Sequence, residues 1–217
     1  MPRAVRSLPW LIIVRLARSF RYDGLEIRVF EEADEAREVF LKASDALGLI
    51  ADRDPADYRR IRRHVSRILF MSVSGGLYVP RLRTCVISID YAKRSTALDV
   101  AMMIVHEATH ARLWSLGCRY TRSAQDWEER TCVKAEIAFA SKISDSAQSI
   151  ARTQNLLSEP WWTDDAKYLR SADELGRLGC PPWLTRLLLG RRPTKGRPQV
   201  CDTSTSLAPR LLAACQR

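Results

Sequence analysis

The segment MIVHEATHARL at residues 103–113 constrains the fold of this chain more than any other, and it holds two of the three histidines. His106 and His110 are four residues apart, and residues at this spacing lie on one face of an α-helix, about one turn apart. Glu107 directly follows the first histidine. The fold must therefore contain a helix that turns both imidazoles toward one point, which is the geometry of a bidentate metal site.

The pattern H-E-x-x-H also indicates a chemistry. Two neutral imidazoles can bind Zn²⁺, while the glutamate, about 100° further round the helix, can reach a water on the metal. Zinc lowers the pKa of that water, and the carboxylate accepts its proton as the water attacks a carbonyl group. We predict one Zn²⁺ per chain, with His106 and His110 as ligands and Glu107 as general base; the alternative is a pair of ordinary histidines on a helix face.

A catalytic zinc site of this kind needs a third protein ligand and one open position. The remaining histidine, His64, lies far upstream among arginines, so a carboxylate or a thiolate is the better candidate. The next predicted helix, at about 124–142, carries Glu128, Glu129 and Glu136. Glu129 and Glu136 share one otherwise apolar face, where a carboxylate without a partner is costly to bury. We expect Glu129 to bind the zinc and Glu136 to hold a ligand histidine; Glu128 is the alternative third ligand, and solvation of all three is the remaining alternative.

Hydrophobic periodicity predicts an α+β fold in which a small antiparallel sheet packs on helices, with HExxH on a central helix. A strand is expected at 25–30. Helices are expected at 31–48, at 55–68 (Pro55 and the following ADYRRIRRHVSRI), from Ser95 or Thr96 to Gly117, and at 124–142, 145–157, 164–178 and 182–190. Two β-rich runs within 68–89 would form a hairpin through Gly75-Gly76. Pro80 places part of the second run at a sheet edge or bulge.

Composition divides the chain into three parts. We expect a basic amphipathic arm at 1–22, a zincin-like metallohydrolase domain at 23–190, and a basic, turn-rich, disordered tail at 191–217. The net charge of +10 and the arginine-rich segments allow weak electrostatic contact with nucleic acid or anionic lipid, although solvated arginine-rich faces are the simpler explanation. The six scattered cysteines and the lack of a membrane-spanning run favour a cytoplasmic protein, with the arm able to lie against a membrane surface.

These motifs resemble the gluzincin class of zinc metallopeptidases, and also a set of small, largely uncharacterised bacterial proteins. The resemblance covers about residues 77–142 and rests on HEATH at 106–110 and EERTCVKAE at 128–136. It implies zinc, a water held by Glu107, and an edge strand within 77–89 that binds an extended peptide above the active-site helix. Because such enzymes often stabilise the oxyanion with a Tyr or His outside the zinc ligands, we nominate Tyr120, whose alternative role is packing.

Two other families of zinc enzymes fit less well. Leu113 and Leu116 stand where a metzincin has its glycine and third histidine, and the sequence around Cys85 does not reproduce the motif that supplies the cysteine ligand of a deformylase. We therefore predict a zinc-dependent hydrolase, a metallopeptidase acting on a peptide or protein substrate. The alternative is a basic protein that binds nucleic acid or a membrane surface and has a structural or vestigial zinc site; nothing in the sequence indicates an oligomeric state.

Overall fold

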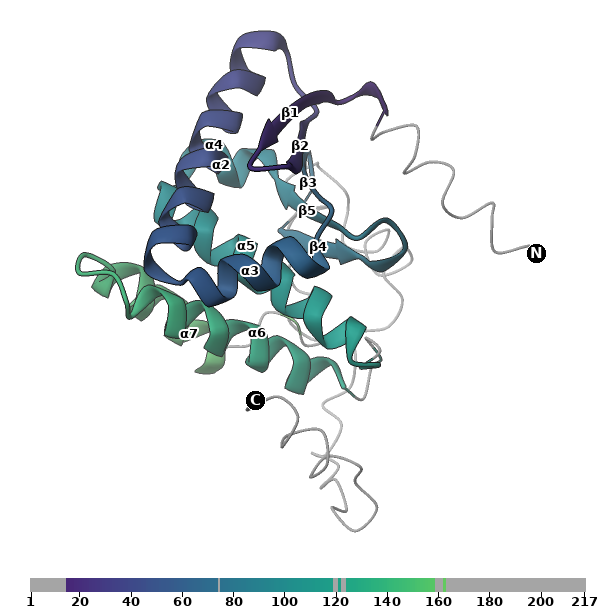
Figure 1. The fold of residues 1–217 in the computed structure, drawn as a ribbon. Coiled ribbons are helices and arrows are strands. Elements are labelled where there is room, and N and C mark those ends of the chain that lie inside the picture. Colours follow the sequence, from purple (N-terminus) through teal and green to yellow (C-terminus); the bar gives the residue numbers. More distant parts are fainter. Residues whose placement is uncertain (1–14, 74, 119–120, 122–123, 159–161, 163–217) are drawn as a thin grey trace, which may run out of the picture. The chain divides into compact units, whose positions relative to one another are not determined.

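A five-stranded mixed sheet packed on helices forms the part of the chain that the computed structural model describes, namely residues 15–73, 75–118, 121, 124–158 and 162 (Figure 1). The chain divides into two compact units, Met1–Trp162 and Thr163–Arg217, and the second lies outside the described residues. The α+β class predicted from the sequence is confirmed.

The sheet has the strand order β1-β2-β3-β5-β4. Its strands are β1 (Arg18–Tyr22), β2 (Leu25–Val29), β3 (Arg67–Met71), β4 (Gly76–Val79) and β5 (Thr84–Ser88). The pairs β1–β2 and β4–β5 are antiparallel, whereas β2–β3 and β3–β5 are parallel. The expectation of an antiparallel sheet is therefore wrong for the three central strands.

The helices explain this mixed topology. They are α2 (Ala33–Arg53), α3 (Pro55–His64), α4 (Ile89–Arg94), α5 (Ala97–Ser115), α6 (Gln125–Ala140) and α7 (Ala147–Ser158). Because α2 and α3 lie between β2 and β3 in the chain, they form a crossover that brings β3 back parallel to β2.

The hairpin expected at Gly75-Gly76 is also wrong, because β4 pairs with β5 and not with β3. The chain reverses instead through the short 3₁₀ helix η1 (Pro80–Leu82) and Arg83, which has the positive φ of 47°. Strand β4 lies at the edge of the sheet, as the sequence predicts, and ends at Val79, just before Pro80, since proline cannot donate to a ladder.

Helix boundaries follow the local signals closely. Asp54 caps α3 by accepting a hydrogen bond from the Asp57 backbone N–H, and Thr96 and Asp99 form a reciprocal capping box at the start of α5. There are two exceptions. The helix expected from Pro55 to Ile68 ends at His64, because Arg67–Met71 forms β3. Helix α2 continues past Gly48 to Arg53, because Ile50 still lies in the core. Tertiary packing there outweighs the low helix propensity of glycine.

Parts of the expected domain plan can be located. Arg18–Tyr22, within the range expected as an N-terminal arm, forms β1 and pairs with β2 along its length. Residues 1–14, the helices expected at 164–178 and 182–190, and the tail at 191–217 lie outside the described residues.

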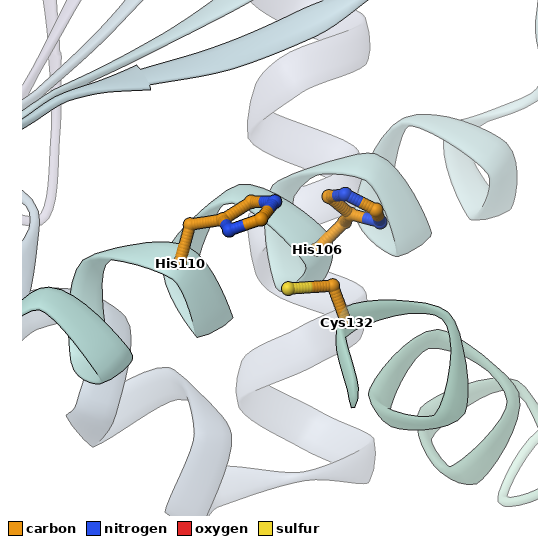
Figure 2. A group of neighbouring side chains, drawn as sticks. All are labelled: His106, His110 and Cys132. Atoms are coloured by element: carbon orange, nitrogen blue, oxygen red, sulfur yellow. The ribbon is translucent and has the colours of Figure 1, made fainter. Parts of the chain in front are cut away.

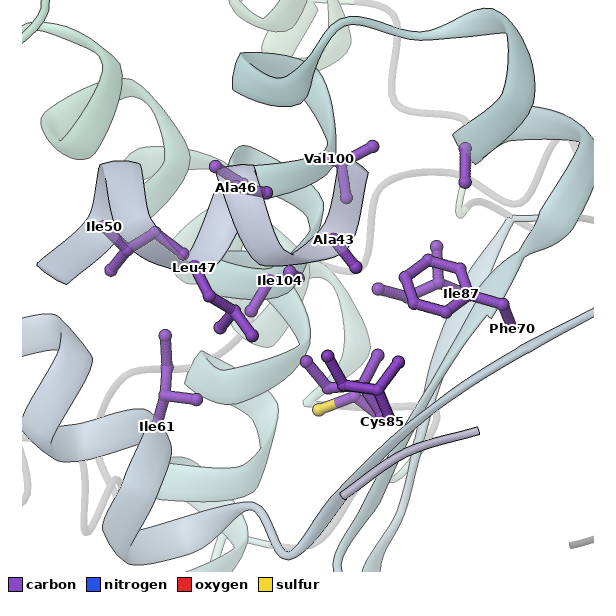
Figure 3. Packing of buried hydrophobic residues seen from close by; sticks show 14 of the residues in the cluster. Ala43, Ala46, Leu47, Ile50, Ile61, Phe70, Cys85, Ile87, Val100 and Ile104 are labelled. Carbon is purple, nitrogen blue, oxygen red and sulfur yellow. The ribbon is translucent and has the colours of Figure 1, made fainter. Parts of the chain in front are cut away.

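The main core lies between one face of the sheet and the helices. Phe70 and Ile87 project from the strands toward Leu47 of α2 and Ile104 of α5 (Figure 3), and these four side chains are fully buried, as is Ile27 of β2. This packing fixes α5 against the sheet. Among the described residues, no helix is both long and apolar enough to cross a lipid bilayer.

Leu47→Ala should lower the free energy of unfolding by about 2–5 kcal/mol, because it leaves a cavity at a fully buried position. Leu41→Ala is the matched control on the same helix, since the Leu41 side chain is 52% exposed. Its effect should stay within about 0.5 kcal/mol. Urea denaturation measures both variants, and similar losses would contradict the core described above.

Candidate metal centre

Helix α5 carries the HEATH segment in its second half, between α6 and the edge strand β4. His106 and Glu107 are buried and His110 is half-buried, so both imidazoles lie largely out of water. The two rings are adjacent, with their centroids 5.0 Å apart and their planes inclined by 62°. The helical spacing thus brings the two imidazoles together, as the sequence indicates.

Glu129 of α6 faces both histidines. One of its oxygens, Oε2, lies 3.3 Å from His106 Nε2 and 3.7 Å from His110 Nε2. Ligand atoms at about 2.0–2.1 Å from a tetrahedral zinc ion are about 3.3–3.4 Å from one another. The distances from Glu129 Oε2 to the two Nε2 atoms are thus close to the spacing of ligand atoms around one zinc ion.

The other nitrogens of the two rings face carboxylates as well. His106 Nδ1 is 2.5 Å from Glu136 Oε1, and His110 Nδ1 is 3.9 Å from Glu128 Oε2. A carboxylate on Nδ1 fixes the ring so that Nε2 is free to bind a metal. Glu136 is well placed to orient His106, whereas Glu128 lies on the Nδ1 side of His110, away from the Nε2 atom that faces Glu129.

Cys132 is a neighbour that the sequence analysis did not consider as a ligand. Its sulfur and one nitrogen from each of His106 and His110 lie within 4.8 Å of one another, and Figure 2 shows the three side chains converging from α5 and α6. Cys132 is fully buried, three residues after Glu129 on the same helix. The i,i+3 spacing was the available signal, because it puts a thiol next to a carboxylate on the face that meets α5.

Strand β4 approaches the site through Gly76. A Cβ atom at residue 76 would overlap Glu107 Oε1 and lie 3.0 Å from Met103 Sδ. Only glycine leaves room for the Glu107 carboxylate at this point of the strand. Gly76 is thus a second site residue missed by sequence reasoning, which treated it as part of a turn.

Burial and mutual charge perturb the ionisable groups. Burial, together with the nearby carboxylates Glu129 and Glu136, raises the pKa of Glu107 to about 8, although His106 opposes the shift. Burial disfavours a charged His106, yet Glu136 and Glu129 outweigh it and raise its pKa. Burial likewise opposes ionisation of Glu129, but hydrogen bonds and charge from His106 and His110 lower its pKa. Burial raises the pKa of the Cys132 thiol well above its usual range.

The residues present fit a bound zinc ion. Glu107 Oε2 and Glu128 Oε1 are buried and have no hydrogen-bond partner among the described residues. Imidazole, carboxylate and thiol are the donor types that zinc binds in proteins. A cation would also offset the buried carboxylates, whose desolvation is otherwise costly. Tyr120, nominated to support the oxyanion, lies outside the described residues.

Gly76→Ala should lower the free energy of unfolding by about 1–3 kcal/mol, because the new methyl group overlaps a buried side chain. In a Glu107→Ala background the same substitution should cost clearly less, since the overlapping carboxylate is gone. The difference is the coupling energy of a double-mutant cycle, measured by urea denaturation. An equal cost in both backgrounds would show that β4 does not lie against Glu107.

In comparisons with known proteins, no family model, no curated protein and no solved structure matches this chain significantly. The likeness to gluzincins therefore remains a prediction based on the HEATH and EERTCVKAE segments.

Proposed function

We propose that this protein is a zinc-dependent hydrolase that cleaves peptide bonds. The observation that carries the proposal is the convergence of His106 Nε2, His110 Nε2 and Glu129 Oε2 at distances of 3.3 and 3.7 Å from the shared carboxylate oxygen. Glu107, the glutamate that H-E-x-x-H hydrolases use as general base, is buried beside them. Bound zinc would polarise a carbonyl group and lower the pKa of a water molecule.

Each side chain then has a separate task. His106, His110 and Glu129 would hold the metal, and Glu136 accepts a hydrogen bond from the Nδ1–H of His106 so that Nε2 stays available. Glu107 accepts a proton from the attacking water and passes it to the leaving amine. Glu128 approaches His110 at Nδ1, whereas Glu129 approaches the Nε2 atoms of both histidines, which supports Glu129 over Glu128 as the third ligand.

The arrangement of elements supports a zincin-like site. Strand β4 is at the edge of the sheet and touches α5 at Glu107, so its outer backbone groups can pair with an extended peptide. The peptide would add to the sheet as a further strand. Its carbonyl carbon would then lie near the Glu107 carboxylate, where Gly76 leaves space.

Cys132 favours a second candidate function. If the thiol joined His106, His110 and Glu129, four protein ligands would close the coordination sphere, and such a zinc ion would be structural. The protein would then be a basic protein that binds nucleic acid or a membrane surface. In either case Cys85 and Cys132 are buried free thiols.

Purified protein should bind about one Zn²⁺ per chain, because the buried donor set surrounds one position. His106→Ala and His110→Ala should lose the metal. Glu129→Ala should weaken zinc binding most among the glutamate variants, and Glu136→Ala should weaken it by about 10- to 100-fold, as expected for a group that orients a ligand. Competition titration with a chromophoric chelator measures the affinities. If Glu128→Ala is the weakest binder, the third ligand is Glu128.

Glu107→Gln should keep the zinc ion and the fold but slow peptide hydrolysis by about 10²-fold or more, since it removes the general base. Cleavage of a mixture of random peptides, followed by mass spectrometry, provides the assay.

Cys132→Ser separates the two candidate functions. This variant should leave hydrolysis largely intact if the zinc ion has an open coordination position. A wild-type protein that binds zinc tightly and hydrolyses no peptide would instead support the closed, structural site.

A further inference from the structure

A group of arginines gathers around His64 at the C-terminal end of α3. Its members, which we call the His64 cluster, are Arg60, Arg63, His64, Arg83 and Arg112. Arg83 ties the group together, because its Nε donates to the His64 carbonyl at 3.2 Å and its terminal nitrogen donates to the Arg63 carbonyl. Three separate elements, α3, the turn after η1, and α5, thus contribute positive charge to one place.

The cluster is strongly positive. Burial lowers the pKa of His64, and the charges of the four arginines lower it further, in agreement with their closeness. Arg60 forms an ion pair with Asp57, which offsets part of this charge. Arg60, Arg63 and Arg83 have exposed side chains, so an anion can reach them from solvent.

The cluster also lies at one end of the edge strand that borders the metal centre. Gly76 begins β4 and contacts Glu107, while the Tyr78 hydroxyl, two residues further on, is 3.4 Å from the His64 carbonyl. After Val79 the chain enters η1 and reaches Arg83. At about 3.3 Å per residue, the strand spans roughly 10 Å between the metal centre and the start of the cluster.

We propose that the His64 cluster binds the carboxylates of an acidic stretch in the peptide substrate, several residues away from the cleaved bond. The inference rests on the proposed peptidase activity. A peptide paired with β4 would continue past Val79 and bring its side chains to Arg63 and Arg83. Arginine suits this task, because its planar fork can donate two parallel hydrogen bonds to one carboxylate.

The geometry favours an acidic peptide over nucleic acid. Among the described residues, no strand pairs with the outer edge of β4, so the cluster continues a surface that already offers backbone donors and acceptors. The Arg83 guanidinium also donates hydrogen bonds to two backbone carbonyls of α3, which fixes the position of this side chain and keeps the cluster compact. A duplex would need a longer track of phosphate contacts for comparable affinity.

Binding can be measured on the full chain carrying Glu107→Gln, which should cleave peptides too slowly to disturb the measurement. The first probe is a fluorescein-labelled, alanine-rich peptide that ends in a run of glutamates, and the second has glutamines in place of those glutamates. Each has about ten residues, which at roughly 3.3 Å per residue is enough to pass along β4. Arg63→Gln tests the cluster, and Arg37→Gln, an exposed position on α2, is the matched control for net charge. Labelled oligothymidylate and phosphatidylserine vesicles test the other polyanions.

The glutamate peptide should bind about 10-fold more tightly than the glutamine peptide, which corresponds to a few exposed ion pairs. Arg63→Gln should weaken only the glutamate peptide, by about 3- to 5-fold, and Arg37→Gln should change neither. Added salt should weaken the glutamate peptide alone, a readout that does not depend on how well a variant folds.

Equal affinity for the two peptides, or an equal effect of Arg37→Gln, would overturn the proposal. Tighter binding of oligothymidylate or of vesicles that depends on Arg63 would assign the cluster to those ligands instead. Zinc content and hydrolysis are measured separately on the chain with Glu107 intact. A protein that selects acidic peptides but lacks zinc or activity would contradict the proposed function, whereas an active enzyme indifferent to acidic residues would contradict only this inference.

Discussion

Burial of carboxylates between α5, α6 and β4 is the interaction on which the rest of this structure depends. Four glutamates take part, and none is more than 7% exposed: Glu107, Glu128, Glu129 and Glu136. Removing such groups from water costs several kcal/mol each unless positive charge and hydrogen bonds compensate. The two histidines supply part of this compensation, and the distances from their Nε2 atoms to Glu129 Oε2 suit a metal ion for the remainder.

Rigid neighbours hold these groups in place. Helix α5 packs against α2, α3, α6, β4 and β5, and much of its surface is therefore buried. Thr96 and Asp99 cap its start, and Asp99 also accepts hydrogen bonds from Ser149 and Arg152 of α7. Side chains carried on such an element are positioned more accurately than side chains on loops, which is what a ligand set requires.

The edge strand joins the two regions to which we assign function. At its start, Gly76 lets the backbone approach Glu107, and near its end Tyr78 contacts the carbonyl of His64. Negative charge is concentrated at the metal centre and positive charge at the His64 cluster, so the two ends of β4 differ in sign. A peptide lying along this edge would meet a cation site and an anion site in turn, and this contrast would fix its direction.

The sequence by itself determined the local features: the capped helix that carries HEATH, the helix that follows it, and the pairing of Glu129 with Glu136 on one face. Each of these depends on spacings of three to seven residues within one helix. It did not determine which strands pair, because the parallel pairing of β2 with β3 depends on how α2 and α3 pack across the sheet. The approach of Gly76 to Glu107 and of Cys132 to the two histidines joins elements far apart in the chain. Such contacts arise only when the elements pack together, and for that reason the tertiary structure alone decided them.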